Sequence, residues 1–195
     1  MGQEGDERGA GGMSESRKPL ILLALLALAG LPAADARADE ASCPRCAFRL
    51  EAPKAAVVAV AEASVSLTVE GLALEAHTAV EDFEAQVLAL SDNTAWRRHM
   101  EAWSVELQGS GPDRGVYRGA PYAARAGTAI VRGRKVWFSR IIFDHEGGQV
   151  TTLTWKIDGN PSPPALLEVY NAMVVSVRFK RALRPVEATA GGKSP

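Results

Sequence analysis

One compact motif in this sequence contains residue types that can carry out chemistry. It is the cysteine pair Cys43-Pro44-Arg45-Cys46. Two cysteines at this spacing can form a local disulfide, act as a thiol-redox couple or supply two ligands to zinc. A zinc ribbon needs a second such pair, and the chain has no other cysteine. A haem attachment site needs histidine at the next position, where the chain has Ala47. We therefore expect a disulfide formed after export, with thiol-redox or metal-binding chemistry as the alternative.

The remaining groups with ligating or catalytic chemistry are scattered along the chain. His77, His99 and His145 complete a metal site only if they fold next to the cysteines, so we predict no metal site and no cofactor. Ser139 and Asp144 are residue types that hydrolases use, but no serine has the spacing of a nucleophile elbow. The glycines after His145 are typical of a hairpin turn. We expect surface-loop positions for Asp144 and His145 and predict no catalytic residue; an enzyme is the third hypothesis.

Basic residues gather around one predicted hairpin and recur near the end of the last predicted strand. They form either a face for an acidic partner or a solvated surface, which is the commoner role of such charges. The residues are Arg125, Arg132, Arg134, Lys135, Arg140, Arg178 and Lys180. The formal net charge of the whole chain is only −1. This balance gives no reason to expect a nucleic acid as partner.

An apolar run near the N-terminus predicts export. Residues 20–31, LILLALLALAGL, have the length of a signal-peptide core and fall short of the about 20 residues that span a bilayer. Arg17 and Lys18 precede this run, and small residues follow it, so cleavage after Ala38 is expected. The membrane is then contacted only through the signal peptide before cleavage. A retained anchor is the alternative, and because the residues before Met13 are acidic, Met13 is an alternative start to Met1.

The first half of the mature chain shows one strand pattern and one helix pattern. Residues 65–69 alternate apolar and polar, as in a half-buried strand. Thr78-Ala79-Val80-Glu81 has the sequence of a capping box, and apolar residues at helical spacing follow it. These features predict a helix over residues 79–90. Trp96, Met100 and Trp103 are spaced to line a second short helix.

The second half has the pattern of an antiparallel meander. Alternation predicts strands over 103–107, 122–131, 136–143 and 150–157, joined by short turns that suit hairpins. A helix starting near Pro163 and a last strand over 174–180 complete the series. The tryptophans have apolar neighbours in phase, which predicts core positions for all of them. They are Trp96, Trp103, Trp137 and Trp155.

Taken together, these elements predict an α+β fold, a mainly antiparallel sheet covered by two or three helices in a single domain. The chain divides into residues 1–38 as an N-terminal extension and signal peptide, 39–56 as a Cys-containing leader, 57–180 as the α+β domain and 181–195 as a disordered tail. The mature part is long enough to bury a core without help from a metal or a disulfide.

The order of elements resembles the PsbP-like superfamily, which includes the photosystem II extrinsic protein, a nuclear Ran-binding factor and small bacterial envelope lipoproteins. The resemblance lies in the segment TAVEDFEAQVLAL, the strand from Trp103 to Leu107, and the ending in which WFSRIIFDHEGGQVTTLTWKI leads into PPALLEVYNAMVVSVRF. It covers roughly residues 57–180. The resemblance implies an α+β fold and, because the superfamily is mainly non-catalytic, no catalytic residues.

We therefore expect an exported, non-catalytic domain, periplasmic or secreted, that binds an unknown protein or small molecule of the cell envelope. The alternative is a thiol-redox or metal-binding protein that works through Cys43 and Cys46.

Overall fold

The computed structural model describes residues 39–159 and 163–180, so the predicted signal peptide and C-terminal tail lie outside the described residues. The strands are β1 (Asp39–Ser42), β2 (Phe48–Ala52), β3 (Val57–Val60), β4 (Ser64–Val69), β5 (Leu72–Val80), β6 (Ser104–Leu107), β7 (Asp113–Tyr117), β8 (Ala120–Val131), β9 (Arg134–His145), β10 (Gln149–Asp158) and β11 (Arg178–Phe179). The helices are α2 (Phe83–Ala89), α3 (Asn93–Met100) and α4 (Pro164–Ser176).

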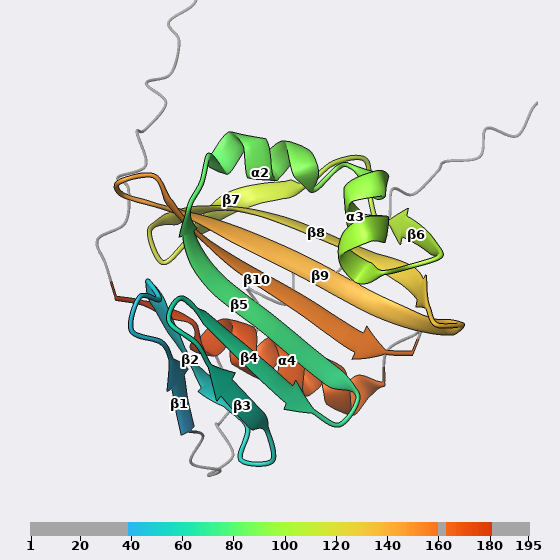
Figure 1. Ribbon diagram of the computed structural model, residues 1–195, viewed down its shortest axis with the longest axis horizontal. Helices are drawn as coiled ribbons and strands as arrows, with labels where there is room; N and C mark the ends of the chain where they lie inside the picture. Colours follow the sequence, from blue (N-terminus) through green and yellow to red (C-terminus); the bar gives the residue numbers. More distant parts are fainter. Residues whose placement is uncertain (1–38, 160–162, 181–195) are drawn as a thin grey trace, which may run out of the picture.

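Eight strands form one antiparallel sheet, in the order β3-β4-β5-β10-β9-β8-β6, with β7 paired to the other end of β8 (Figure 1). The long central strands β8, β9 and β10 are joined by the two short turns that the sequence predicted. A second sheet consists of β1, β2 and β11. The α+β class predicted from the sequence is confirmed.

Side-chain alternation gives the large sheet two faces of different composition. On β10, Leu153 and Trp155 point to one side with Ile157, and Thr154 and Lys156 point to the other. We call the side toward α4 the inner face and the side toward α2 and α3 the outer face. A one-residue slip in register would exchange these two sets, so the pattern of β10 fixes its pairing with β5 and β9.

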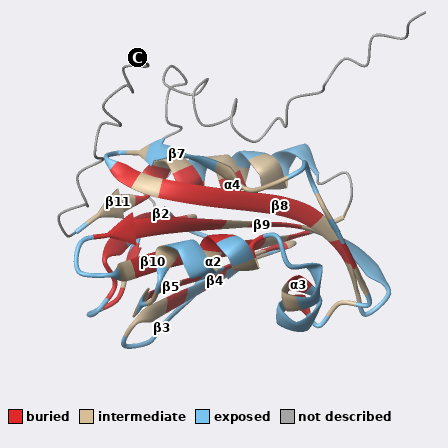
Figure 2. Cartoon of the chain, turned by 90° about the horizontal axis from the view of Figure 1, so that it is seen from above, coloured by how far each residue is buried: buried red, intermediate tan, exposed pale blue. Residues whose placement is uncertain are grey.

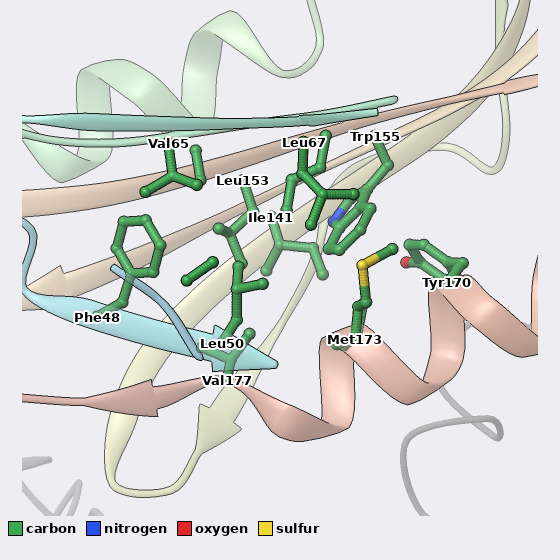
Figure 3. Close-up of a cluster of buried hydrophobic side chains, with 14 of the residues drawn as sticks. Phe48, Leu50, Val65, Leu67, Ile141, Leu153, Trp155, Tyr170, Met173 and Val177 are labelled. Carbon is green, nitrogen blue, oxygen red and sulfur yellow. The ribbon is translucent and has the colours of Figure 1, made fainter. Parts of the chain in front are cut away.

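The inner face is covered by α4 and the small sheet. Figure 3 shows Tyr170 and Met173 of α4 pointing toward Trp155 of β10, with Phe48 of β2 closing the other end of the cluster. Phe48 and Trp155 are fully buried. Burying an aromatic or aliphatic side chain of this size contributes about 1.5–3 kcal/mol, so this layer is a main source of stability.

The outer face is covered over only part of its width. Val87 of α2, its C-cap residue Leu90, and Trp96 and Met100 of α3 are buried in a cluster with Phe138 of β9. The rings of Trp96 and Phe138 lie 4.4 Å apart between centroids. Both helices lie over β8 and β9, and the outer side of β4 and β5 has no helix above it (Figure 1). Continuous buried stretches run along β8, β9 and β10, whereas buried positions alternate with more exposed ones along β4 and β5 (Figure 2).

Residues 39–52, predicted as a polar leader, form the hairpin of β1 and β2. The strands pair from Asp39 opposite Ala52 to Ser42 opposite Arg49. Phe48 and the other alternate residues of β2 are buried in the same cluster as the inner face of the large sheet. The domain limits drawn from the sequence stay a prediction, but this segment shares the core of the domain.

The capping box predicted at residues 78–81 is wrong, because residues 78–80 belong to β5 and pair with β10. β5 continues to Val80, which pairs with Gln149, and Thr78 is buried in the sheet. The helix begins at Phe83, where the side chain of Asp82 accepts a hydrogen bond from the Ala85 amide at 2.7 Å. Asp82 is therefore the N-cap.

The strand predicted over residues 174–180 is also wrong in most of its length. α4 continues through Ser176, and only Arg178–Phe179 form a strand. The Ser176 hydroxyl donates to the Met173 carbonyl at 2.7 Å and accepts from the Glu51 amide at 2.9 Å. These bonds tie the end of the helix to β2 and explain why it does not unwind earlier.

One tryptophan predicted for the core is exposed. Trp96 and Trp155 are buried and Trp137 packs against the inner cluster, as predicted, but 88% of Trp103 is exposed. Its amide donates to the Ile130 carbonyl at 2.8 Å, after Glu101 has adopted the left-handed conformation with φ 49°. The backbone thus joins the sheet while the indole stays in solvent. None of the described helices has the length and apolar character needed to cross a bilayer.

Replacing Gly127 by alanine tests the close packing of β6 on β8. An added Cβ would lie 2.5 Å from the Glu106 carbonyl oxygen and 2.6 Å from the Phe138 ring. Because the carbonyl belongs to the backbone, the strand pair must shift, and we expect the free energy of unfolding to fall by about 1–3 kcal/mol. Chemical denaturation measures the change. Gly111→Ala is the control, since its Cβ meets no atom within 4 Å; equal stability of G127A and G111A would contradict this packing.

Candidate ligand-binding cleft

Cys43 and Cys46 form a disulfide at the turn between β1 and β2, and both are buried. The Cys46 amide donates to the Cys43 carbonyl at 3.2 Å, and Lys180 Nζ donates to the same carbonyl at 3.2 Å. Arg45 at the tip of the turn forms an ion pair with Glu62 at 2.8 Å. The disulfide therefore belongs to the core and presents no exposed sulfur for exchange with a substrate.

A buried chain of hydrogen bonds links this hairpin to the large sheet. The Ala47 amide donates to Thr78 Oγ1 at 3.0 Å, Thr78 Oγ1 lies 3.0 Å from Thr151 Oγ1, and Thr151 Oγ1 lies 2.9 Å from His145 Nε2. His145 is 1% exposed, and Asp144 is also buried. The prediction of surface-loop positions for these two residues is wrong, because β9 runs on to His145 and the turn begins after it.

The structure does not bring the predicted basic residues together on one face. Arg132, Arg134 and Lys135 lie at the exposed turn between β8 and β9. Arg178 and Lys180 lie in or beside β11, in the layer under the inner face. The two remaining members, which are less exposed, lie directly opposite each other on the outer face: Arg125 and Arg140.

A cleft of about 620 Å³ lies on the uncovered part of the outer face. Side chains of β4, β5 and β10 form its floor, and the end of α3 and the turn between β8 and β9 form its wall. Its ionisable residues are Glu75, His99, Glu101, Arg132, Lys156 and Asp158. Apolar surface from Met100, Val131 and Val136 completes the lining. The cleft thus combines charges of both signs with an apolar wall, which suits a small polar ligand.

Two ion pairs cross this cleft. Lys156 Nζ lies 3.3 Å from Glu75 Oε1 on the floor, and Arg132 Nη2 lies 3.9 Å from Glu101 Oε2 at the wall. All four side chains are partly or largely exposed to solvent. Such pairs contribute only about 0–1 kcal/mol, so a ligand can displace them at little cost.

A row of polar residues crosses the sheet beside the cleft. Glu75, Thr154, Arg140 and Arg125 stand opposite one another on four neighbouring strands. Arg140 Nε donates to Thr154 Oγ1 at 3.0 Å, and its guanidinium carbon lies 4.6 Å from the centre of the Trp96 ring. Burial lowers the pKa of Arg140, while Glu75 and Glu81 act in the opposite direction. Arg140 stays charged, and its guanidinium is held by Thr154 and by the Trp96 ring.

Two histidines lie within the electrostatic reach of Arg140. Burial lowers the pKa of His99 to about 4, with further lowering by Arg140 and Lys156. The His99 ring lies edge-on to Trp96 at 6.2 Å, although the residue keeps exposed surface through which solvent screens these charges. Burial also lowers the pKa of His77, and Arg140 adds to this effect against Glu81 and Glu75. Both imidazoles are therefore neutral at pH 7.

The arrangement is suited to binding and positioning a ligand. In the described part of the chain, no three His, Cys, Asp or Glu residues gather as a metal site. Ser139 is fully buried, and its hydroxyl lies 3.4 Å from the Tyr170 hydroxyl in the inner core. The cleft itself offers the neutral imidazole of His99 and two ion pairs of low strength, while Arg140 and His77 lie beside it.

Sequence reasoning missed this cleft. Its signal was the polar set of alternating positions on β5 and β10, where Glu75 and His77 face Thr154 and Thr152. A strand buried under a helix on that side would carry apolar residues instead. The sequence does not reveal which part of the sheet the helices cover.

Neither a family model nor a curated protein matches the sequence. Solved structures do. The cyanobacterial PsbP (CyanoP) from Synechocystis matches with a TM-score of 0.52 and 11% identity, over 78% of this chain and 99% of that one. The chain has the PsbP fold. This confirms the resemblance seen in the sequence at the level of fold.

Two further structures match. A protein from Bacteroides thetaiotaomicron gives a TM-score of 0.51 with 8% identity, over 74% of this chain and 49% of that chain, so the chain spans about half the length of that protein. LpqN of Mycobacterium tuberculosis gives a TM-score of 0.47 with 13% identity, over 68% of this chain and 82% of that chain.

A histidine titration by NMR tests the electrostatics of the cleft. We expect the His99 ring to titrate well below 6.5, toward 4, and Arg140→Gln to raise that midpoint by removing a nearby cation. By linkage, the part of the stability that depends on neutral His99 is present above pH 6.5 and is lost as the pH falls from 6.5 toward 4. Lys54→Gln, a substitution in an exposed turn, is the control. An unshifted His99 midpoint near 6.5 would contradict this account.

Proposed function

We propose that this chain is a non-catalytic binding domain, periplasmic or secreted, that holds a small polar ligand in the cleft beside α3. The observation that carries the proposal is the cleft itself: about 620 Å³, with charges of both signs on a rigid antiparallel sheet. Binding groups on strands are positioned more firmly than groups on loops, which favours recognition of a defined ligand.

The buried disulfide supports the proposed compartment. Disulfides persist in oxidising environments and are rare in reducing ones, and the Cys43–Cys46 bond indicates an oxidising compartment. The predicted signal peptide lies outside the described residues, so export stays part of the proposal. Cleavage after Ala38 would start the mature chain at Asp39, the first residue of β1.

The thiol-redox alternative is less well supported, because exchange requires an accessible sulfur. Only 3% of Cys43 and 2% of Cys46 are exposed. The Cys43→Ser/Cys46→Ser double variant separates the two functions. We expect it to lose about 2 kcal/mol of unfolding free energy through loop entropy and to keep ligand binding in the cleft. Loss of binding in a variant that circular dichroism shows to be folded would favour the thiol function.

Filling the cleft tests the proposed function directly. Ala73 lies on its floor, so we expect Ala73→Phe to abolish binding there. The probes are a panel of amino acids, dicarboxylates, monosaccharides and dipeptides. A probe at 100 times its Kd stabilises the protein by about 2.7 kcal/mol, which a thermal-shift assay detects.

The matched control is Ala59→Phe, on the exposed strand β3 and outside the cleft lining. We expect it to bind the same probes as the unmodified protein. The proposal fails if no probe binds the unmodified protein, or if A73F binds as well as A59F.

A further inference from the structure

We infer that Arg140 anchors an oxyanion, so that the ligand of the cleft carries a carboxylate or phosphate group bound at the Nη groups of Arg140. This inference rests on the proposed function, because it names the chemical class of the same ligand.

Two contacts fix the Arg140 guanidinium and leave its Nη groups for a ligand. Nε donates to Thr154 Oγ1 at 3.0 Å, and the plane of the guanidinium lies by the Trp96 ring, 4.6 Å from its centre. Within residues 39–159 and 163–180, neither Nη group of Arg140 has a hydrogen bond or ion pair. A guanidinium fixed at one edge presents its remaining N–H groups as a fork, whose geometry matches a planar carboxylate or a phosphate.

Among the described residues, Glu75 and Glu81 both act electrostatically on Arg140, but neither forms an ion pair with it. Glu75 is in the same cross-strand row as Arg140, but its Oε1 pairs with Lys156 Nζ at 3.3 Å. Arg140 is only partly buried, so a ligand has access to it. Glu75 and His99, which line the cleft, both interact electrostatically with Arg140. Arg140 itself is not among the residues that line the cleft, so its guanidinium stands beside the cleft and not in its wall.

A second buried cation makes an anion favourable at this point. Arg125 lies directly opposite Arg140 and is only 7% exposed. Its Nη2 donates to the Gly109 carbonyl at 2.9 Å, while Nε and Nη1 are buried without a partner in the described structure. Like charges that face each other across strands are destabilising. A negative charge at Arg140 would add to the compensation that Asp113 supplies at Arg125 and that Glu75 and Glu81 supply at Arg140.

The two histidines couple anion binding to pH. Burial is the largest cause of the lowered pKa of both histidines. Arg140, Lys156 and His77 lower the pKa of His99 further, and Glu75 raises it; at His77, Glu81 and Glu75 act against Arg140. An oxyanion at Arg140 neutralises the cation that both imidazoles sense. Protonation of the histidines then becomes easier, and by reciprocity the anion binds more tightly as the pH falls.

NMR titration of the full chain at constant ionic strength tests the site, with acetate, inorganic phosphate and chloride as probes. We expect saturable shifts of the Arg140 and Thr154 amides with acetate or phosphate and no saturation with chloride. For acetate, the affinity is counted per ionised molecule, because acetate is partly protonated at pH 5, and it should be higher at pH 5 than at pH 7. Comparison of the dissociation constants for acetate and phosphate identifies which oxyanion the site prefers. Arg140→Gln should weaken binding about tenfold or more. Lys54→Gln, in an exposed turn outside the cleft lining, should bind as the unmodified protein does.

The outcomes separate this inference from the proposed function. If acetate and phosphate shift these amides no more than chloride does, there is no oxyanion site. If a panel probe binds the cleft and R140Q binds it equally well, the cleft is a ligand site but Arg140 is not its anchor. Should R140Q fail to fold, Arg140→Lys keeps the charge and loses the fork. Weaker binding by R140K then supports the inference, and unchanged binding overturns it.

Discussion

The unequal cover on the two faces of the large sheet determines the rest of this structure. An antiparallel sheet must bury at least one apolar face and can leave the other in water. Here α4 and the hairpin of β1 and β2 cover the inner face, whereas α2 and α3 each reach only about 10–12 Å at 1.5 Å per residue. β9, with 12 residues, is several times longer. Two short helices cannot cover that area, and the uncovered strands carry polar side chains.

The same inequality places the cleft. Trp96 and Phe138 form the centre of the covered part, and the polar row of Glu75, Thr154 and Arg140 begins where that cover ends. Arg140 belongs to both parts, since its guanidinium lies by Trp96 and its Nε binds Thr154. A charged group at the border of a packed layer is held in place and still reachable, which is what a binding residue requires.

The disulfide hairpin has a supporting role in this arrangement. It closes the inner cluster at Phe48 and is joined to the sheet through Ala47, Thr78 and Thr151. α4 is tied to the same hairpin by the Ser176 hydroxyl, which accepts from Glu51. The inner face and the covered part of the outer face stabilise the domain, and the proposed function uses the uncovered part of the outer face.

The sequence was most informative where one local pattern acted alone. Alternation located β8, β9 and β10 within a few residues, and the order of elements gave the α+β class and the resemblance to PsbP, which the fold confirms. It failed where tertiary contacts overrode a local signal. Thr78 fits a capping box but forms a buried hydrogen bond to the Ala47 amide instead, and residues 174–176 alternate like a strand but complete α4.

The candidate site was harder to predict for a similar reason. Arg125 and Arg140 were placed in a basic surface from their neighbours in sequence, whereas their strand register puts them opposite each other on the outer face. Which positions on β5 and β10 escape the helices depends on the lengths and directions of α2 and α3. Neither is encoded in the residues of the cleft itself.

Amide hydrogen exchange, with and without a probe that binds, is the most direct test of the claim that the outer face holds the ligand. The account predicts slower exchange in β5, β10 and α3 when the probe is bound, with no change in α4 or in β1 and β2. Protection confined to α4 and the disulfide hairpin, with none along β5 and β10, would contradict it.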